Sequence, residues 1–169
     1  MANTYRVIPA GEIEGNLIDR INREWALISA RDGDRINTMT ASWGTFGTLW
    51  GRPVATVFIR PQRYTFGLAE NAGMLTLSFF GDTCREALRY CGSHSGRDGD
   101  KFAAAGLSPV LEDGIVYPAE ARLVLVLKKL YADDIREENM TDPSPMYTYE
   151  TRDFHRFYIC EIVEARVFD

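Results

Sequence analysis

Two arginines lie where an apolar strand is expected to end and a helix to begin. Arg60 and Arg63 belong to the segment RPQRYT (60–65), and the helix is expected from Phe66. Two guanidiniums, the Thr65 hydroxyl and the free backbone N–H groups of a helix start together suit a terminal phosphate. The alternative is that both arginines simply lie in solvent at the end of a strand, and this segment by itself favours neither interpretation.

A second segment, NTMTASWG (37–44), alternates small and hydroxyl side chains along an expected strand. A flat heterocycle needs backbone N–H and C=O groups within reach of its polar edge and little bulk in the way, and Thr40, Ala41 and Ser42 would permit this. The alternative is an ordinary strand with one polar face and Trp43 in the core. Taken alone, the segment favours the ordinary strand.

A third segment, SHSGRDGDK (93–101), is rich in Gly and Ser and carries two cations just before an expected helix. It could close over an anion, or it could be a surface turn capped by Ser95 or Asp98, because these residue types favour turns whatever they bind. The NTPase phosphate-loop spacing GxxxxGK followed by Ser or Thr is missing, and no GxGxxG pattern occurs. The segment therefore predicts at most a local anion site.

The two histidines and three cysteines offer little chemistry of their own. His155 lies at the start of the last expected strand, where its side chain could face a cofactor, although a lone histidine there is more often structural or solvated. His94 follows Cys91, but zinc needs about four ligands and a Cys–His nucleophile needs an orienting third group. Cys84 and Cys91 are better explained as neighbours on one buried helix face. Paired carboxylates and GxSxG are also absent, so a bound cofactor would have to supply the chemistry.

The elements that would position these residues are mostly strands. Short runs of β-branched and aromatic residues, each closed by Gly, Pro, Asn or Asp, are typical of β structure. The run LVLVL (123–127) is apolar without alternation, as expected for a barrel strand that outer helices also cover. We therefore expect a mostly β fold, a β-barrel with short peripheral helices, whose clearest strands are Ala26–Ala30, Thr38–Trp43, Val54–Arg60, Met74–Phe80, Arg122–Leu127 and Arg156–Val163.

Short helices are expected between the strands. The third would start at Asp82 or Thr83 as its cap and end at Gly92. A fourth would begin near Asp98, because DKFAAA (100–105) favours a helix. The first three are expected at Ile13–Glu24, Phe66–Asn71 and Thr83–Tyr90.

The composition excludes several classes of protein. The chain has 169 residues, of which 46% are hydrophobic and 25% charged, as is typical of one globular domain spanning 1–169. A net charge of −5 argues against a nucleic-acid-binding face, and the acidic stretch 132–149 is expected to be a solvated loop. No apolar run suits a signal peptide or a membrane span. The odd cysteine count argues against a disulfide framework, so a cytoplasmic location is expected.

Five segments, taken together, resemble the flavoredoxin-like branch of the flavin reductase family. The pairing of RPQRYT with SGRDxDK, in that order, is more specific than either segment alone. The resemblance implies an FMN-binding split barrel that holds FMN noncovalently, takes NADH or NADPH as donor and forms a homodimer with each flavin near the subunit interface. The segments are NTMTASWG (37–44), LWGRPVATVFIRPQRYT (49–65), LSFF (77–80), CGSHSGRDGDKF (91–102) and DFHRFYICEI (153–162).

The same resemblance implies roles for individual residues. His155 would be the catalytic residue, at the place of a Gly-Asp-His turn that faces the nicotinamide, although this chain has Arg152-Asp153-Phe154-His155 there. The flavin ring and ribityl chain would be lined by Thr40, Ala41, Ser42 and Trp43, with Asn37, Thr38 and Met39 of the same segment. The chain and phosphate would be held by Arg60, Gln62, Arg63, Tyr64 and Thr65, and further flavin or nucleotide contacts would come from Ser95, Arg97 and Lys101.

These expectations lead to one principal hypothesis and two alternatives. The first is an oxidoreductase in which NADH or NADPH delivers hydride to bound FMN, which then passes electrons to free flavin, oxygen or a partner protein. The second is an FMN electron carrier that a partner protein reduces. The third is a barrel for haem or pyridoxal phosphate, which predicts a purified protein without a flavin spectrum.

Overall fold

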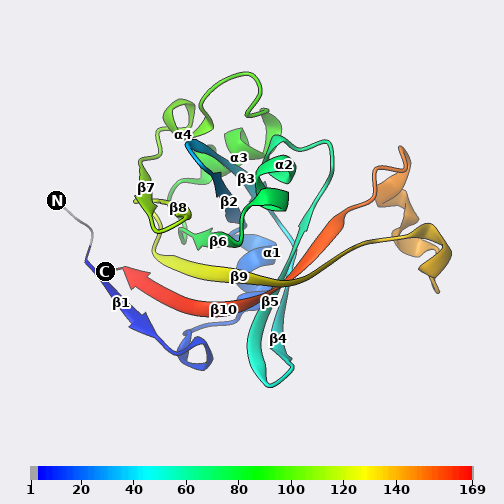
Figure 1. Cartoon of the computed structure of the whole chain (residues 1–169), viewed down its shortest axis with the longest axis horizontal. Coiled ribbons are helices and arrows are strands. Elements are labelled where there is room, and N and C mark those ends of the chain that lie inside the picture. The colour runs from blue at the N-terminus through cyan, green and yellow to red at the C-terminus, as the bar shows by residue number, and fades with distance from the viewer. Residues whose placement is uncertain (1–3, 169) are drawn as a thin grey trace.

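The architecture is a strongly curved antiparallel sheet (Figure 1). The structure is a computed structural model that describes residues 4–168. Within those residues no pairing joins the first strand of the path to the last, so the barrel is open along one seam and the predicted split barrel is confirmed. The strands follow the order β3 (Arg35–Ala41), β2 (Ala26–Asp32), β6 (Met74–Phe79), β9 (Leu123–Asp134), β10 (Arg156–Phe168), β5 (Arg52–Ile59) and β4 (Thr45–Leu49), and β1 (Tyr5–Ile8) pairs with β10.

Helices and a small second sheet lie in the connections between these strands. In Figure 1 the helices α2, α3 and α4 and the β7–β8 hairpin gather on one side of the sheet. No helix within residues 4–168 is long and apolar enough to cross a membrane. The bounds are α1 (Leu17–Arg23), α2 (Tyr64–Asn71), α3 (Arg85–Ser93), α4 (Lys101–Ala104), β7 (Pro109–Glu112) and β8 (Ile115–Pro118), with 3-10 turns η1 (Ala10–Glu12), η2 (Glu137–Asn139) and η3 (Ser144–Tyr149).

Strand β9 separates two hydrophobic cores. Leu123, Leu125 and Leu127 point into the barrel interior, where they pack with side chains of β2, β5 and β6. Val124 and Val126 point the other way, into a second cluster formed with α3, α4 and the β7–β8 hairpin. All five side chains are buried. The prediction that LVLVL is covered on both faces is therefore confirmed, and the reason is the two-residue period of a strand.

All six predicted strands are present, but several bounds were wrong. Strand β3 begins at Arg35 and ends at Ala41, so Ser42 and Trp43 lie beyond it. Strands β9 and β10 continue to Asp134 and Phe168, because their central position in the sheet supplies hydrogen-bond partners well past the apolar runs. Strands β1, β4, β7 and β8 were not predicted; they are short and largely exposed apart from β8.

Strand β4 is recognisable mainly by its turn. Trp50 and Gly51 join β4 to β5 with φ of 54° and 69°. Two consecutive residues with positive φ are typical of the tight turn whose twist matches a β-hairpin. The hairpin therefore depends on Gly51 and on a strained Trp50, while the β4 residues themselves give only a weak strand pattern.

The helix starts also differ from those predicted. Helix α1 begins at Leu17 and not Ile13, because the Asn16 side chain accepts hydrogen bonds from the N–H groups of Ile18 and Asp19. Helix α4 is capped in the same way by Asp100, not Asp98. Both caps are of the residue types that favour helix starts, Asn and Asp, but the sequence pattern did not fix their positions.

Helix α3 begins without a side-chain cap. It starts at Arg85 after Cys84, which has the left-handed φ of 59°, and it runs on through Gly92 to Ser93. The predicted cap was wrong: the Thr83 hydroxyl donates to the Phe80 carbonyl, and no side-chain bond caps the helix start. Cys91 is fully buried and Cys84 packs at the edge of the same cluster, as the sequence indicated.

The acidic stretch is only partly a loop. Ala132–Asp134 belongs to β9, which overturns the predicted boundary. The following residues carry η2 and η3 and form an arm that projects from the sheet between β9 and β10 (Figure 1). We call residues 135–155 the arm. The Thr148 backbone carbonyl and the side chains of Tyr149 and Asp153 return to the barrel, so the arm contributes to the site described next.

Candidate functional site

A cavity of about 410 Å³ lies where β3, the start of α2 and the α3–α4 connection meet. The structure brings together here predicted site residues from three segments that are far apart in the sequence. We call it the cationic cavity. Four lining residues were not predicted as site residues: Gly92, Ser93, His94 and Gly96. The predicted residues that line it are Asn37, Met39, Gln62, Arg63, Tyr64, Thr65, Ser95, Arg97 and Lys101.

Three cations line this cavity, and no carboxylate is among its lining residues within the described chain. An Arg63 Nη atom donates to the Gly92 carbonyl at 2.9 Å, and an Arg97 Nη atom donates to the Gln62 carbonyl at 2.9 Å. Lys101 is buried and its Nζ donates to the Cys91 carbonyl at 2.6 Å. Each cation is thus held by a neutral carbonyl and not by a carboxylate that would neutralise it, so the cavity attracts anions.

Burial of Lys101 makes its charged form less stable than it would be in water. Burial lowers the pKa of Lys101 from 10.5 to about 8, and the nearby Arg63 charge adds to this effect while Cys91 opposes it. A buried cation beside another cation gains stability when an anion binds between them. The geometry and the lowered pKa therefore agree that this cavity is suited to a phosphate or a similar group.

Two walls of the cavity are held in register by a buried hydrogen bond. The Asn37 side-chain amide donates to the Thr65 hydroxyl at 2.8 Å, which fixes β3 against the first turn of α2. The α3–α4 connection approaches this pair so closely that a Cβ on Gly96 would lie 2.4 Å from Asn37 Oδ1 and 2.5 Å from Tyr64 Cδ1. Only glycine fits here without a shift of its neighbours. In the sequence, the only indication of this close contact is the glycine of Ser95-Gly96-Arg97.

The remaining predicted residues of β3 do not line the cavity. Thr38 is fully buried and its hydroxyl donates to the Ile28 carbonyl and accepts from Ser29. The Thr40 hydroxyl donates to the Leu88 carbonyl of α3. Ala41 packs in the barrel core, and Ser42 is exposed beyond the strand. Alternation along β3 therefore separates Thr38 and Thr40 from Asn37 and Met39, because successive side chains point to opposite faces.

A smaller cavity of about 250 Å³ lies beyond the end of β3. Its lining is almost entirely apolar, so it suits a flat ring more than a charged group. We call it the aromatic cavity, and it is lined by Trp43, Gly44, Thr45, Phe58, Ile135 and Tyr149.

His155 contacts two of the residues that line this aromatic cavity, Trp43 and Tyr149. It is buried, its ring centroid is 4.9 Å from that of Trp43, and its Nδ1 is 3.0 Å from the Tyr149 hydroxyl. Burial lowers the pKa of His155 to about 4, and the charges of Arg60 and Arg63 contribute. His155 is therefore neutral near pH 7. Because Arg63 lines the cationic cavity and also acts on His155, the two cavities are neighbours.

Arg60 does not join Arg63 in the cationic cavity. Its Nη2 donates to the Thr148 carbonyl at 2.9 Å, and its Nη1 lies 3.7 Å from Asp153. Its guanidinium also lies over the Tyr149 ring, 5.8 Å from the centroid. The expected pairing of two arginines is therefore not formed, and Arg60 instead holds the arm against the barrel.

The fold and the two cavities define a class: a split β-barrel protein with an anion-receptive cavity beside an aromatic one. Residues 18–169 match the family model described as a flavin reductase like domain. The chain belongs to this family, as the segment resemblance had predicted. Among curated protein sequences, none matches the chain.

Solved structures support the same fold. An FMN-binding domain of a flavin reductase-like enzyme from Shewanella baltica OS155 aligns with a TM-score of 0.71 and 19% identity, covering 99% of this chain and 78% of that one. Flavoredoxin of Desulfovibrio vulgaris (Miyazaki F) aligns with 0.66 and 25%, covering 85% and 68%. The NADH:FAD oxidoreductase SgcE6 of Streptomyces globisporus, solved with NAD and FAD fragments, aligns with 0.64 and 16%, covering 86% and 78%.

Proposed function

We propose that this protein binds FMN noncovalently and accepts hydride from NADH or NADPH. The observation that carries the proposal is the cationic cavity, where three cations and the start of α2 converge without a lining carboxylate in the described chain. A dianionic phosphomonoester is the group that such a set of donors fits best. Structural neighbours that bind FMN agree with this choice.

The chain's own residues would divide the work of binding. Arg63, Arg97 and Lys101 would hold the phosphate, and Thr65 would donate its hydroxyl at the start of α2. The apolar walls around Trp43 would exclude water from the ring end of the cofactor. When bound, FMN would supply the hydride-accepting redox chemistry.

His155 would act as a neutral hydrogen-bonding group. Its low pKa makes it a poor proton donor near pH 7, and the Tyr149 hydroxyl occupies its Nδ1. We therefore propose that His155 orients the ring end of the site and does not exchange its own proton during turnover. His155 would therefore be a positioning residue of the site and not the catalytic residue that the family resemblance implied.

Anaerobic reduction distinguishes the reductase from the electron carrier. We expect the purified protein to be yellow and its flavin absorbance to bleach rapidly when NADH or NADPH is added without air. Absence of bleaching, with ready reduction by a donor protein, would instead favour the carrier, which the likeness to flavoredoxin supports. A protein that neither retains nor takes up flavin would exclude both.

We also propose a homodimer. Support comes from apolar side chains left exposed beside the aromatic cavity and on the β4–β5 hairpin, where Trp43 is 43% and Trp50 is 60% exposed. Exposed aromatic surface of this kind is typical of subunit interfaces. Light scattering of the FMN-loaded protein is expected to give twice the chain mass, and a monomer at all concentrations would exclude the assembly.

A further inference from the structure

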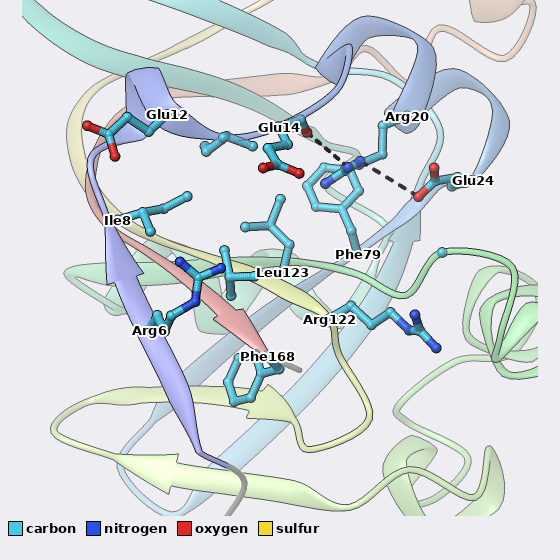
Figure 2. Close-up of a pocket in the computed structure, with 13 residues that line it drawn as sticks. Arg6, Ile8, Glu12, Glu14, Arg20, Glu24, Phe79, Arg122, Leu123 and Phe168 are labelled. Carbon is cyan, nitrogen blue, oxygen red and sulfur yellow. Dashed lines mark hydrogen bonds and ion pairs between the residues drawn. The ribbon is translucent and has the colours of Figure 1, made fainter.

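A third cavity, of about 360 Å³, opens at the end of the barrel that β1 and η1 cover (Figure 2). It shares no lining residue with the cationic or the aromatic cavity. Its walls come from β1, η1, α1 and the ends of β6, β9 and β10. We call it the barrel-end cavity. Its size lies within the range of small-molecule sites, which begins at about 300 Å³.

The inner wall of the barrel-end cavity is apolar. Phe79 and Leu123 are almost fully buried and belong to the barrel core, whose end they form here. Ile8, Ile13 and Val167 pack against the same core and are only partly covered. An apolar group that entered this space would therefore bury both its own surface and that of the core side chains.

The rim of the cavity is charged, and part of that charge is unpaired. Arg6 and Glu14 lie on opposite sides, and Figure 2 shows the Arg6 guanidinium and the Glu14 carboxylate directed toward the space between them. Neither charged group has a hydrogen-bond or ion-pair partner within residues 4–168. Opposite charges that face one cavity without meeting leave room for a ligand that carries both.

Arg20 supplies a fixed cation on the Glu14 side. Its Nη2 donates to the Glu14 backbone carbonyl at 3.1 Å, and its Nε lies 3.9 Å from a Glu24 carboxylate oxygen. The guanidinium also lies over the Phe79 ring, 5.9 Å from the centroid. Arg20 is thus held in place at the boundary between the apolar wall and the charged rim, with N–H groups still free to donate.

From this arrangement we infer that the barrel-end cavity binds a small zwitterion with an apolar body, an α-amino acid with a hydrophobic side chain. The side chain would lie on Phe79 and Leu123. Arg6 and Arg20 would hold the carboxylate, and the Glu14 carboxylate would hold the ammonium group.

The balance of charge favours a zwitterion over a simple anion or a simple amine. The lining contains Arg6, Arg20 and Arg122 against Glu12, Glu14 and Glu24, so its formal charge is zero. A simple anion would desolvate Glu14 without a partner, and a simple amine would do the same to Arg6. A phosphate of a flavin or a nicotinamide nucleotide would meet the Glu14 and Glu24 carboxylates here, whereas the described lining of the cationic cavity offers it none.

Calorimetric titration of the flavin-loaded protein tests the inference. L-leucine and L-phenylalanine are expected to bind at one site per chain. Each analogue that lacks one charge, 4-methylpentanoate or 3-methylbutylamine, is expected to bind at least tenfold more weakly, because a charged hydrogen bond of about 1.5–3 kcal/mol is lost. Serine, which lacks the apolar body, is expected to bind more weakly as well.

Two variants and two matched controls locate the site. Arg6→Gln and Glu14→Gln are exposed substitutions outside the proposed FMN site, and each is expected to weaken L-leucine at least tenfold while the flavin absorbance stays unchanged. Arg89→Gln and Glu86→Gln remove the same charges from the exposed face of α3 and are expected to change nothing.

Several results would overturn the inference. These are no saturable binding of either amino acid, equal binding of the singly charged analogues, or unchanged binding in both cavity variants. Loss of dimer mass in those variants without any amino-acid binding would show that the cavity is a subunit contact, which also overturns it. Because the cavity is separate from the cationic cavity, a protein that bound L-leucine but no FMN would refute only the proposed flavin function.

Discussion

Replacing Gly96 with alanine tests the cationic cavity at its narrowest point. The added Cβ would lie 2.4 Å from Asn37 Oδ1 and 2.5 Å from Tyr64 Cδ1, both far inside contact distance. Asn37 cannot yield freely, because it is buried and donates to Thr65 at 2.8 Å. Overpacking of this kind costs about 1–3 kcal/mol. If the loop moves to relieve it, the FMN affinity is expected to fall about 5- to 150-fold.

The assay is a flavin fluorescence titration combined with a thermal melt. Gly67→Ala is the matched control, because Gly67 lies in α2 and an added Cβ would have no atom within 4 Å apart from its chain neighbours and the backbone of its own helix. That substitution is expected to leave FMN affinity unchanged and to stabilise the helix by about 0.5–1 kcal/mol. A Gly96→Ala protein with wild-type FMN affinity and wild-type melting temperature would refute the packing described for the cavity.

Three further predictions follow from the same contacts. Arg63→Ala is expected to lower the affinity for FMN about 10- to 100-fold and the affinity for riboflavin little, because only FMN carries the phosphate. Arg60→Ala is expected to loosen the arm without changing this preference for FMN. Equal losses of affinity for both ligands in Arg63→Ala would contradict the phosphate assignment. Because the pKa of Lys101 is about 8, FMN affinity is expected to decline as pH rises above 8, and Lys101→Met should show a flat profile in titrations from pH 7 to pH 9.5. The pKa of His155 is lowered from 6.5 to about 4, so between these pH values the unfolded chain binds a proton at this residue and the folded chain does not. The free energy of unfolding is therefore expected to fall by about 3 kcal/mol between pH 6.5 and pH 4, and urea melts that show the same fall in His155→Gln would exclude this residue as the cause.

The sequence allowed much of the β framework to be predicted. The LVLVL run indicated a strand buried on both faces, and two separate cores now surround it. The segments RPQRYT and SHSGRDGDK suggested local anion sites, and their residues Arg63, Arg97 and Lys101 line one cavity. The strand could be predicted because residue period is a property of a short stretch of chain, whereas anion binding in the cavity stays a prediction.

Other features could not be found in the sequence, because they depend on contacts between distant segments. Arg60 and Arg63 look equivalent in RPQRYT, yet Arg60 bonds to Thr148, 88 residues away, and only Arg63 reaches the cavity. Gly96 matters because Asn37 lies against it. The sequence by itself determined six of the ten strands within residues 4–168, the type of core and the chemistry available for an anion. Only the tertiary structure decided which side chains share a cavity, because that depends on the packing of segments whose separation along the chain carries no local signal.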